Sequence, residues 1–99
     1  MKMIYIFSLK EEKNPLGGLI EKIGVSIYSE LDVQGVYTGV PAEASFIGSH
    51  KLKAESKLDI IACNHAQAES LMEEIKKYNA THPRFPMHAY CLNIESHVL

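Results

Sequence analysis

The sequence predicts an α+β fold of the ferredoxin-like βαββαβ type, in which two helices cover one face of a four-stranded antiparallel sheet. The first observation is the order of apolar patterns along the chain, which is strand, helix, strand, strand, helix, strand. The second is the size and composition of the chain. It has 99 residues, of which 46% are hydrophobic and 22% charged, as is usual for one globular domain. We therefore expect a single domain over residues 1–99.

The first half of the chain predicts two strands and one helix. Residues 2–9 are rich in Ile, Tyr and Phe and are followed by charged residues, which is typical of a buried strand. Asn14 and Pro15 then form a helix start, with Asn14 as the cap. Apolar residues at spacings of three and four predict a helix of about 16 residues. These residues are Leu16, Leu19, Ile20, Ile23, Ile27 and Leu31.

The second strand is predicted over residues 35–40, and Pro41 ends it. Residues 41–56 show no sustained periodicity and predict a long loop, a feature that is often functional in a small domain. The third strand is predicted over residues 57–63.

The second helix has the clearest signal in the sequence. Asn64 is a capping residue, and Gln67 lies three residues later, as in a capping box. An apolar stripe follows at helical spacing, made of Ala68, Leu71, Met72, Ile75 and Tyr78. Residues 79–86 predict a linker with several turns, and residues 87–94 predict the last strand.

The strands are apolar on both faces, whereas a sheet with one open face should alternate apolar and polar residues. In the first strand, Met3, Tyr5 and Phe7 lie on one face, and Ile4 and Ile6 lie on the other. Something must cover the second face, and another copy of the chain is the simplest cover. The sequence therefore predicts a homo-oligomer, and we expect Ile61 and Cys63 to lie in its contacts.

The expected strand order, fourth-first-third-second, sorts the candidate ligands between the two ends of the sheet. The loops 10–14, 41–56 and 79–86 all fall at one end, which brings His50, His82 and His88 near one another. Imidazoles favour divalent or copper ions, so these three histidines are the first candidate metal site. Cys63 and His65 are the alternative, because residues two apart share one side of an extended segment.

Several classes of protein are disfavoured. The net charge is −2, and the only arginine is Arg84, so we expect no nucleic-acid partner. No stretch approaches the roughly 18 apolar residues of a membrane span, and two cysteines are too few for a disulfide framework. We therefore expect a cytoplasmic protein without membrane insertion. The spacing pattern of a catalytic site is also missing, so we do not expect an enzyme.

The whole chain resembles the PII-like signalling superfamily, which includes the CutA-type ion-tolerance proteins. The resemblance lies in three segments, 3–7, 35–40 and 87–95, and is strongest to a short PII-like branch. It implies a trimer with the sheets packed inward and a ligand in the clefts between subunits. By position, the implied ligand-binding residues are Tyr37, Thr38, Gly39, His50, Arg84 and His88.

The sequence departs from the nucleotide-binding members of that superfamily. They have a Gly-rich, Lys-bearing linker before the last strand, and residues 79–86 here contain neither Gly nor Lys. They also carry basic residues beyond that strand, which this chain does not. Adenine nucleotide is therefore a doubtful ligand.

Two functional hypotheses follow. The first is a PII-like regulatory trimer that reports a small ligand to a partner protein, such as a transporter. The alternative is an accessory protein of a heavy-metal tolerance system that binds copper or zinc.

Overall fold

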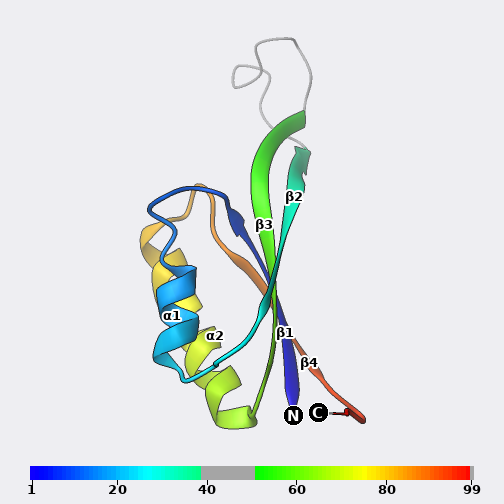
Figure 1. Ribbon diagram of the computed structural model, residues 1–99. Coiled ribbons are helices and arrows are strands. Elements are labelled where there is room, and N and C mark those ends of the chain that lie inside the picture. The colour runs from blue at the N-terminus through cyan, green and yellow to red at the C-terminus, as the bar shows by residue number, and fades with distance from the viewer. Residues whose placement is uncertain (39–50, 99) are drawn as a thin grey trace.

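The computed structural model describes residues 1–38 and 51–98 and confirms the predicted order of elements (Figure 1). The six elements are β1 (Lys2–Leu9), α1 (Leu16–Lys22), β2 (Ser29–Thr38), β3 (Lys51–Cys63), α2 (His65–Thr81) and β4 (His88–Asn93). In the described part of the chain, no helix is long and apolar enough to cross a membrane.

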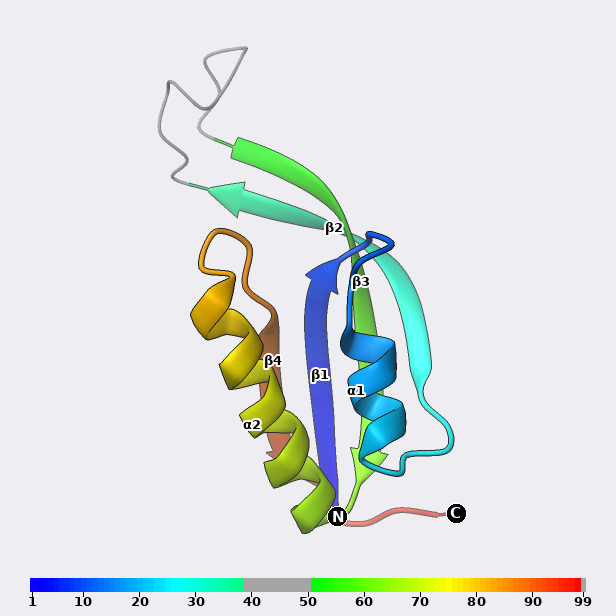
Figure 2. The ribbon, with the colours of Figure 1, turned by 90° about the vertical axis from the view of Figure 1, so that its left-hand side faces the viewer.

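The strands form one sheet in the order β2-β3-β1-β4, and every neighbouring pair is antiparallel. This is the strand order that the sequence predicts. Both helices lie on the same face of the sheet, with α1 in front of β1 and β3 and α2 beside β4 (Figure 2). The other face is not covered by either helix.

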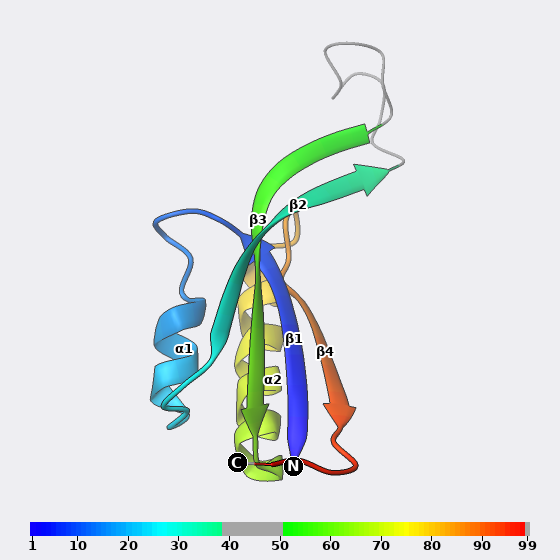
Figure 3. The same cartoon turned by 45° about the vertical axis from the view of Figure 1, so that its right-hand side comes forward.

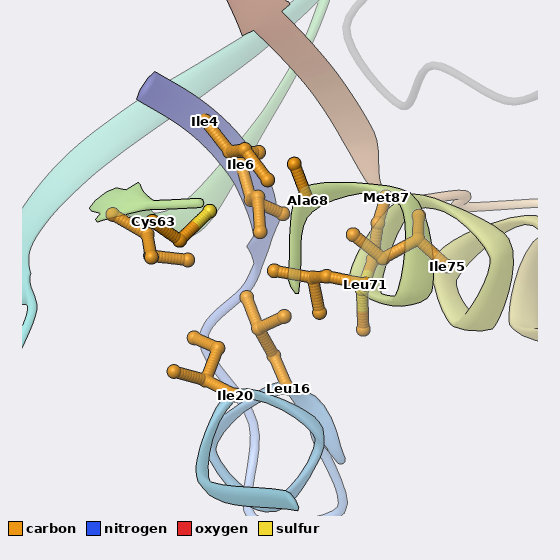
Figure 4. Packing of buried hydrophobic residues seen from close by; sticks show 10 residues of the cluster. Ile4, Ile6, Leu16, Ile20, Cys63, Ala68, Leu71, Ile75 and Met87 are labelled. Carbon is orange, nitrogen blue, oxygen red and sulfur yellow. The ribbon is translucent and has the colours of Figure 1, made fainter. Parts of the chain in front are cut away.

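The hydrophobic core lies between the sheet and the two helices (Figure 4). Ile4 and Ile6 of β1 are fully buried there, together with Leu16 of α1 and Leu71 of α2. Burying a side chain of this size stabilises the fold by about 1.5–3 kcal/mol relative to leaving it exposed. The core is therefore built from β1 and the inner faces of both helices.

The first helix is shorter than predicted, because α1 ends at Lys22. Gly24 has a φ of 87°, a left-handed conformation that is common just beyond a helix end. Ile27 consequently lies outside the helix with 82% of its surface exposed, and Leu31 belongs to β2. Asn14 contributes as expected, since its side-chain oxygen accepts a hydrogen bond from the Leu16 N–H at 2.9 Å, although Pro15 holds the cap position itself.

The predicted loop over residues 41–56 was wrong for its last six residues. Residues 51–56 belong to β3 and pair with β2, in a register that sets Thr38 opposite Lys51 and Val33 opposite Ser56. Leu52, Ala54 and Ser56 alternate with charged residues, so a period-two pattern is present, but Ala54 and Ser56 are small and Leu52 is its only large apolar residue. Residues 41–50 lie outside the described residues.

The early start of β3 creates an extension that the sequence does not predict. β1 pairs with β3 only as far as Leu9 opposite Ser56. Beyond that pair, residues 34–38 and 51–55 form a two-stranded ribbon, here called the arm, which bends away from the sheet (Figure 3).

The second helix and the segment after it agree closely with the prediction. The capping box is present: the Asn64 side chain accepts from the Gln67 N–H at 2.8 Å, and Gln67 Oε1 accepts from the Asn64 N–H at 3.0 Å. The Asn79 side chain then makes two hydrogen bonds to the backbone of Met87. Its Nδ2 donates to the Met87 carbonyl at 2.9 Å, and its Oδ1 accepts from the Met87 N–H at 2.8 Å. This pair of bonds closes the loop between α2 and β4.

One charged side chain is buried on the helix-covered face of β3. Asp59 is fully buried, and neither of its carboxylate oxygens has a hydrogen-bond partner. Lys57 Nζ lies 3.6 Å from Asp59 Oδ2 but only 3.0 Å from Glu30 Oε1, so one cation is shared by two carboxylates. Burial raises the pKa of Asp59, Lys57 opposes that rise, and Glu30 adds to it.

The buried carboxylate makes the stability of the protein depend on pH. Because the pKa of Asp59 is raised on folding, its neutral form stabilises the native state at low pH. That contribution is lost as the pH rises from about 3.9, the ordinary value, through the raised pKa. We predict that Asp59→Asn raises the free energy of unfolding at pH 7 by about 1–3 kcal/mol. Lys57 keeps Glu30 as its partner in the variant.

Urea denaturation at several pH values measures this effect. The difference between Asp59→Asn and the wild type should be small near pH 3 and should grow towards pH 7. A variant that is less stable than the wild type at pH 7 would show that the charged pair with Lys57 is net favourable. Glu73→Gln on the exposed surface of α2 is the matched control, and its stability should follow the wild type.

The two bonds from Asn79 lead to a second prediction. Asn79→Ala removes both bonds and leaves the Met87 backbone groups without them, so we expect a loss of about 1–3 kcal/mol in stability. Asn79→Asp keeps the acceptor but sets a carboxylate oxygen against the Met87 carbonyl in place of the donor, so it should also destabilise the protein. Amide hydrogen exchange in residues 82–87 should be faster in both variants than in the wild type. Equal exchange in all three proteins would contradict the assigned role.

Candidate functional site

A cleft of about 400 Å³ lies where the arm bends past the ends of β1 and β4. The arm supplies one wall, through residues 34–37 of β2. The opposite wall comes from the end of β1 and the start of β4. The lining residues from these two strands are Phe7, Ser8, His88 and Tyr90.

Aromatic rings dominate this region. Phe7 and Tyr90 line the cleft and meet edge to face, with their ring centroids 6.2 Å apart. Tyr37 also lines the cleft and meets Phe85 edge to face at 5.6 Å. The second contact joins the arm to the loop between α2 and β4, since Phe85 belongs to that loop. The Arg84 guanidinium lies 5.9 Å from the centroid of the Phe85 ring.

Gly35 allows the strands of the arm to approach each other closely beside the cleft. A Cβ atom at this position would lie 2.9 Å from Ser56 Oγ, which is closer than real Cβ contacts. Ser56 Oγ itself donates to the Ala54 carbonyl at 3.3 Å. Packing against Ser56 therefore explains why a glycine occupies position 35 in the predicted strand.

The structure brings together part of the predicted ligand-binding set. Tyr37 and His88 line the cleft, and Arg84 lies beside it through its contact with Phe85. Thr38 is the last residue of β2 and is not part of the lining. Gly39 and His50 lie outside the described residues.

Three residues of this region were missed by the sequence analysis. Phe7 and Tyr90 were assigned only to strands. The register of β4 on β1, with Tyr5 opposite Tyr90 and Phe7 opposite His88, brings their rings together. Phe85 was placed in a linker without a role. An aromatic residue between two prolines, as in residues 83–86, is the signal that could have singled it out.

The predicted metal ligands have other contacts in the structure. His82 stacks on Tyr78 with a centroid distance of 4.0 Å, and its Nδ1 lies 2.9 Å from the Tyr78 carbonyl oxygen. It therefore helps to close the C-terminus of α2. His88 is exposed at the start of β4, and His50 lies outside the described residues. Among residues 1–38 and 51–98, no group of three or more His, Cys, Asp or Glu side chains could hold a metal ion.

The alternative pair, Cys63 and His65, does not share one side of a strand. The strand ends at Cys63, and His65 is already the first residue of α2, because Asn64 caps that helix. His65 lies 3.3 Å from Glu69 on the exposed surface. Cys63 is buried under the helices, where burial and then the neighbouring Cys91 raise the pKa of its thiol. A raised pKa disfavours the thiolate that binds metals.

The open face of the sheet is strongly apolar, as the sequence predicts. The register places Tyr5 between Ile60 and Tyr90, and Phe7 beside Leu58, all on the face that the helices leave uncovered. The exposed large hydrophobic residues of this face are Tyr5, Phe7, Leu31, Tyr90 and Leu92. We call these five residues the open-face patch.

The expectation for Ile61 and Cys63 was wrong. Both are buried on the helix-covered face, where they pack into the core of the same chain. Side chains alternate along β3, so Leu58 and Ile60 point to the open face in their place. The error arises because both faces of β3 are apolar, and the sequence alone does not say which one the helices cover.

A larger groove of about 990 Å³ runs between α2 and β4. It contains His65 and His88, but these lie at opposite ends, since α2 begins at one end of the sheet and β4 at the other. Much of its wall is the charged outer surface of α2, with Glu69, Glu73 and Lys76. The smaller cleft is therefore the better candidate for a ligand site.

Comparisons of sequence identify no relative. No protein-family model matches the chain, and no curated protein matches it either.

Comparisons of structure are informative. A CutA protein from Pyrococcus horikoshii aligns with a TM-score of 0.69 and 12% identity, over 99% of this chain and 87% of the other. The PII-like protein CPII from Thiomonas intermedia, bound to ADP, AMP and bicarbonate, aligns with a TM-score of 0.65 and 13% identity, over 98% and 94%. A PII-like signalling protein from Thermus thermophilus aligns with a TM-score of 0.61 and 16% identity, over 94% and 85%. The chain therefore has the ferredoxin-like fold of the PII-like and CutA proteins.

Proposed function

We propose that this protein is a PII-like regulatory module that forms a homotrimer, binds a small ligand at the cleft and signals to a partner protein. The observation that carries the proposal is the cleft itself, in which the arm, the end of β1 and the start of β4 meet. This is the region that the resemblance to PII-like proteins assigns to ligand capture, and Tyr37 and His88 line it.

The open-face patch supports self-association. Each of its five side chains has more than a third of its surface exposed in the isolated chain. Contiguous exposed apolar surface of this kind is typical of an interface. A trimer with the open faces turned inward covers this patch. Phe7 and Tyr90 belong both to the patch and to the cleft lining, so the proposed ligand site lies at the edge of the subunit contact.

The contact between Tyr37 and Phe85 supports the signalling part of the proposal. A ligand in the cleft touches Tyr37 on the arm and His88 at the end of the α2–β4 loop, so it links two segments distant in sequence. Binding energy is then available to hold the arm in one position. A partner protein that contacts the arm, such as a transporter, responds to the presence of the ligand. We propose this regulatory role, without catalysis, for the cytoplasm.

The first test is the state of assembly. Sedimentation velocity at micromolar concentration should give about three times the mass of one chain. Leu92→Lys, in the open-face patch, should shift the protein to the monomer, because a lysine in an apolar contact costs several kcal/mol. Glu69→Lys makes the same residue on the exposed surface of α2 and should leave the trimer intact. A wild-type monomer at these concentrations would contradict the proposal.

The second test is ligand binding by thermal melting. A panel of nucleotides, organic acids, neutral heteroaromatic compounds and divalent metal salts should contain a compound that raises the melting temperature of the wild type. The shift should be lost in Tyr37→Ala and kept in Tyr78→Ala, because Tyr78 stacks on His82 away from the cleft. A shift that survives in Tyr37→Ala would place the ligand elsewhere.

A further inference from the structure

The proposed function does not specify the chemical class of the ligand, and the residues that line the cleft bear on it. This inference rests on that function, because it assumes that the cleft binds a ligand. Ten described residues line it, and none of the ten is Asp, Glu, Lys or Arg. Three of them carry aromatic rings: Phe7, Tyr37 and Tyr90. The described walls therefore offer rings and neutral polar groups.

An ionised ligand group would have no opposite charge among these ten residues. Moving a charge out of water without a compensating partner is costly, and the cost is much larger than for a neutral amide. The nearest arginine, Arg84, lies over the Phe85 ring and is not part of the lining. The described lining thus offers an anion no partner, and it offers a cation only the faces of its rings, which compensate a small part of the cost of leaving water.

Two of the hydroxyl groups in the lining already have partners within the protein. Ser8 Oγ accepts a hydrogen bond from Asn14 Nδ2 at 2.9 Å, and Ser56 Oγ donates to the Ala54 carbonyl. His88 is exposed, and the register places its imidazole on the same face of the sheet as Phe7 and Tyr90. A ligand with a polar atom at its edge can bond to this imidazole.

The size and the rings favour a planar ligand. A volume of about 400 Å³ is at the small end of the range of small-molecule sites, which is roughly 300–1,000 Å³. Aromatic side chains bind planar rings by offset stacking or by edge-to-face contact. We propose that the cleft binds an uncharged, planar heteroaromatic compound, which packs on Tyr37 and Tyr90 and is hydrogen-bonded at its edge by His88.

Three probes of nearly equal size separate charge from shape. Indole-3-acetamide is neutral, indole-3-acetate is its anionic isostere, and tryptamine is a cation on the same ring. Calorimetry at about pH 8, above the range in which histidines usually titrate, should give the tightest binding for the amide. We expect at least about tenfold weaker binding for the anion and for the cation.

Variants locate the binding and test the role of charge. Tyr37→Ala should weaken indole-3-acetamide about tenfold, and Tyr78→Ala, the same change away from the cleft, should leave its affinity unchanged. Val33→Lys places a cation in the lining and should make indole-3-acetate the tightest probe. Circular dichroism and melting confirm that each variant is folded.

The outcomes distinguish this inference from the proposed function. If indole-3-acetate binds best to the wild type and Tyr37→Ala abolishes it, the ligand is anionic, and the inference is wrong while the cleft remains a ligand site. If none of the three probes binds, the inference is also wrong, and the thermal-melting panel still decides the proposed function. If indole-3-acetamide binds equally well to Tyr37→Ala, the probe binds outside the cleft, and the inference fails.

Discussion

The central strand β1 connects β3 with β4 and carries the side chains on which both helices pack. Its backbone pairs with β3 on one side and with β4 on the other. Its side chains Ile4 and Ile6 are fully buried beneath the helices, where Leu16 of α1 and Leu71 of α2 meet them. Both helices pack on these isoleucines, and α1 also contacts α2, so β1 is the common support of the two helices. The cleft depends on the same strand, because Phe7 and Ser8 at the end of β1 form part of its wall.

The same central strand explains why the chain has two apolar faces. Ile4 and Ile6 serve the core, whereas Tyr5 and Phe7 alternate with them and point to the open face. A chain with this pattern gains from covering the second face, which is the physical basis for the proposed trimer. Asp59 interrupts the apolar character of the covered face. Its carboxylate is buried without a hydrogen-bond partner, and the effect of burial exceeds that of Lys57, so the pKa of Asp59 is raised.

The sequence predicts the element order and the second helix, because each has a strong local signal, and the strand order follows from the βαββαβ topology. The capping box of Asn64 and Gln67 and the long amphipathic stripe define α2 without help from tertiary contacts. The first helix was predicted too long, since Ile27 and Leu31 continue the helical spacing by coincidence and Gly24 ends the helix by its backbone conformation. The arm was missed because residues 51–56 are stabilised by pairing with β2, an interaction between segments that single-sequence patterns do not report.

The candidate site was predicted only in part for a similar reason. Position in the fold brought Tyr37 and His88 to one cleft, because both lie near strand ends at the same end of the sheet. Phe85 and Tyr90 join them through side-chain packing, which depends on the register and on the bend of the arm. Whether the Cys63 side chain points to the core or to the open face depends on which face of β3 the helices cover. Both apolar faces satisfy the same pattern, so only the packed structure decides between them.

The arm has one further consequence, for the cooperativity of folding. Beyond Leu9 it is a ribbon of two strands with no third strand beside it, and such ribbons are only marginally stable on their own in water. The aromatic contact between Tyr37 and Phe85 ties it to the rest of the domain. The arm is thus a separate local unit whose opening costs much less free energy than global unfolding. A molecule in the cleft contacts the arm, so its binding free energy stabilises the ordered arm. Occupancy of the cleft and order of the arm are therefore thermodynamically linked.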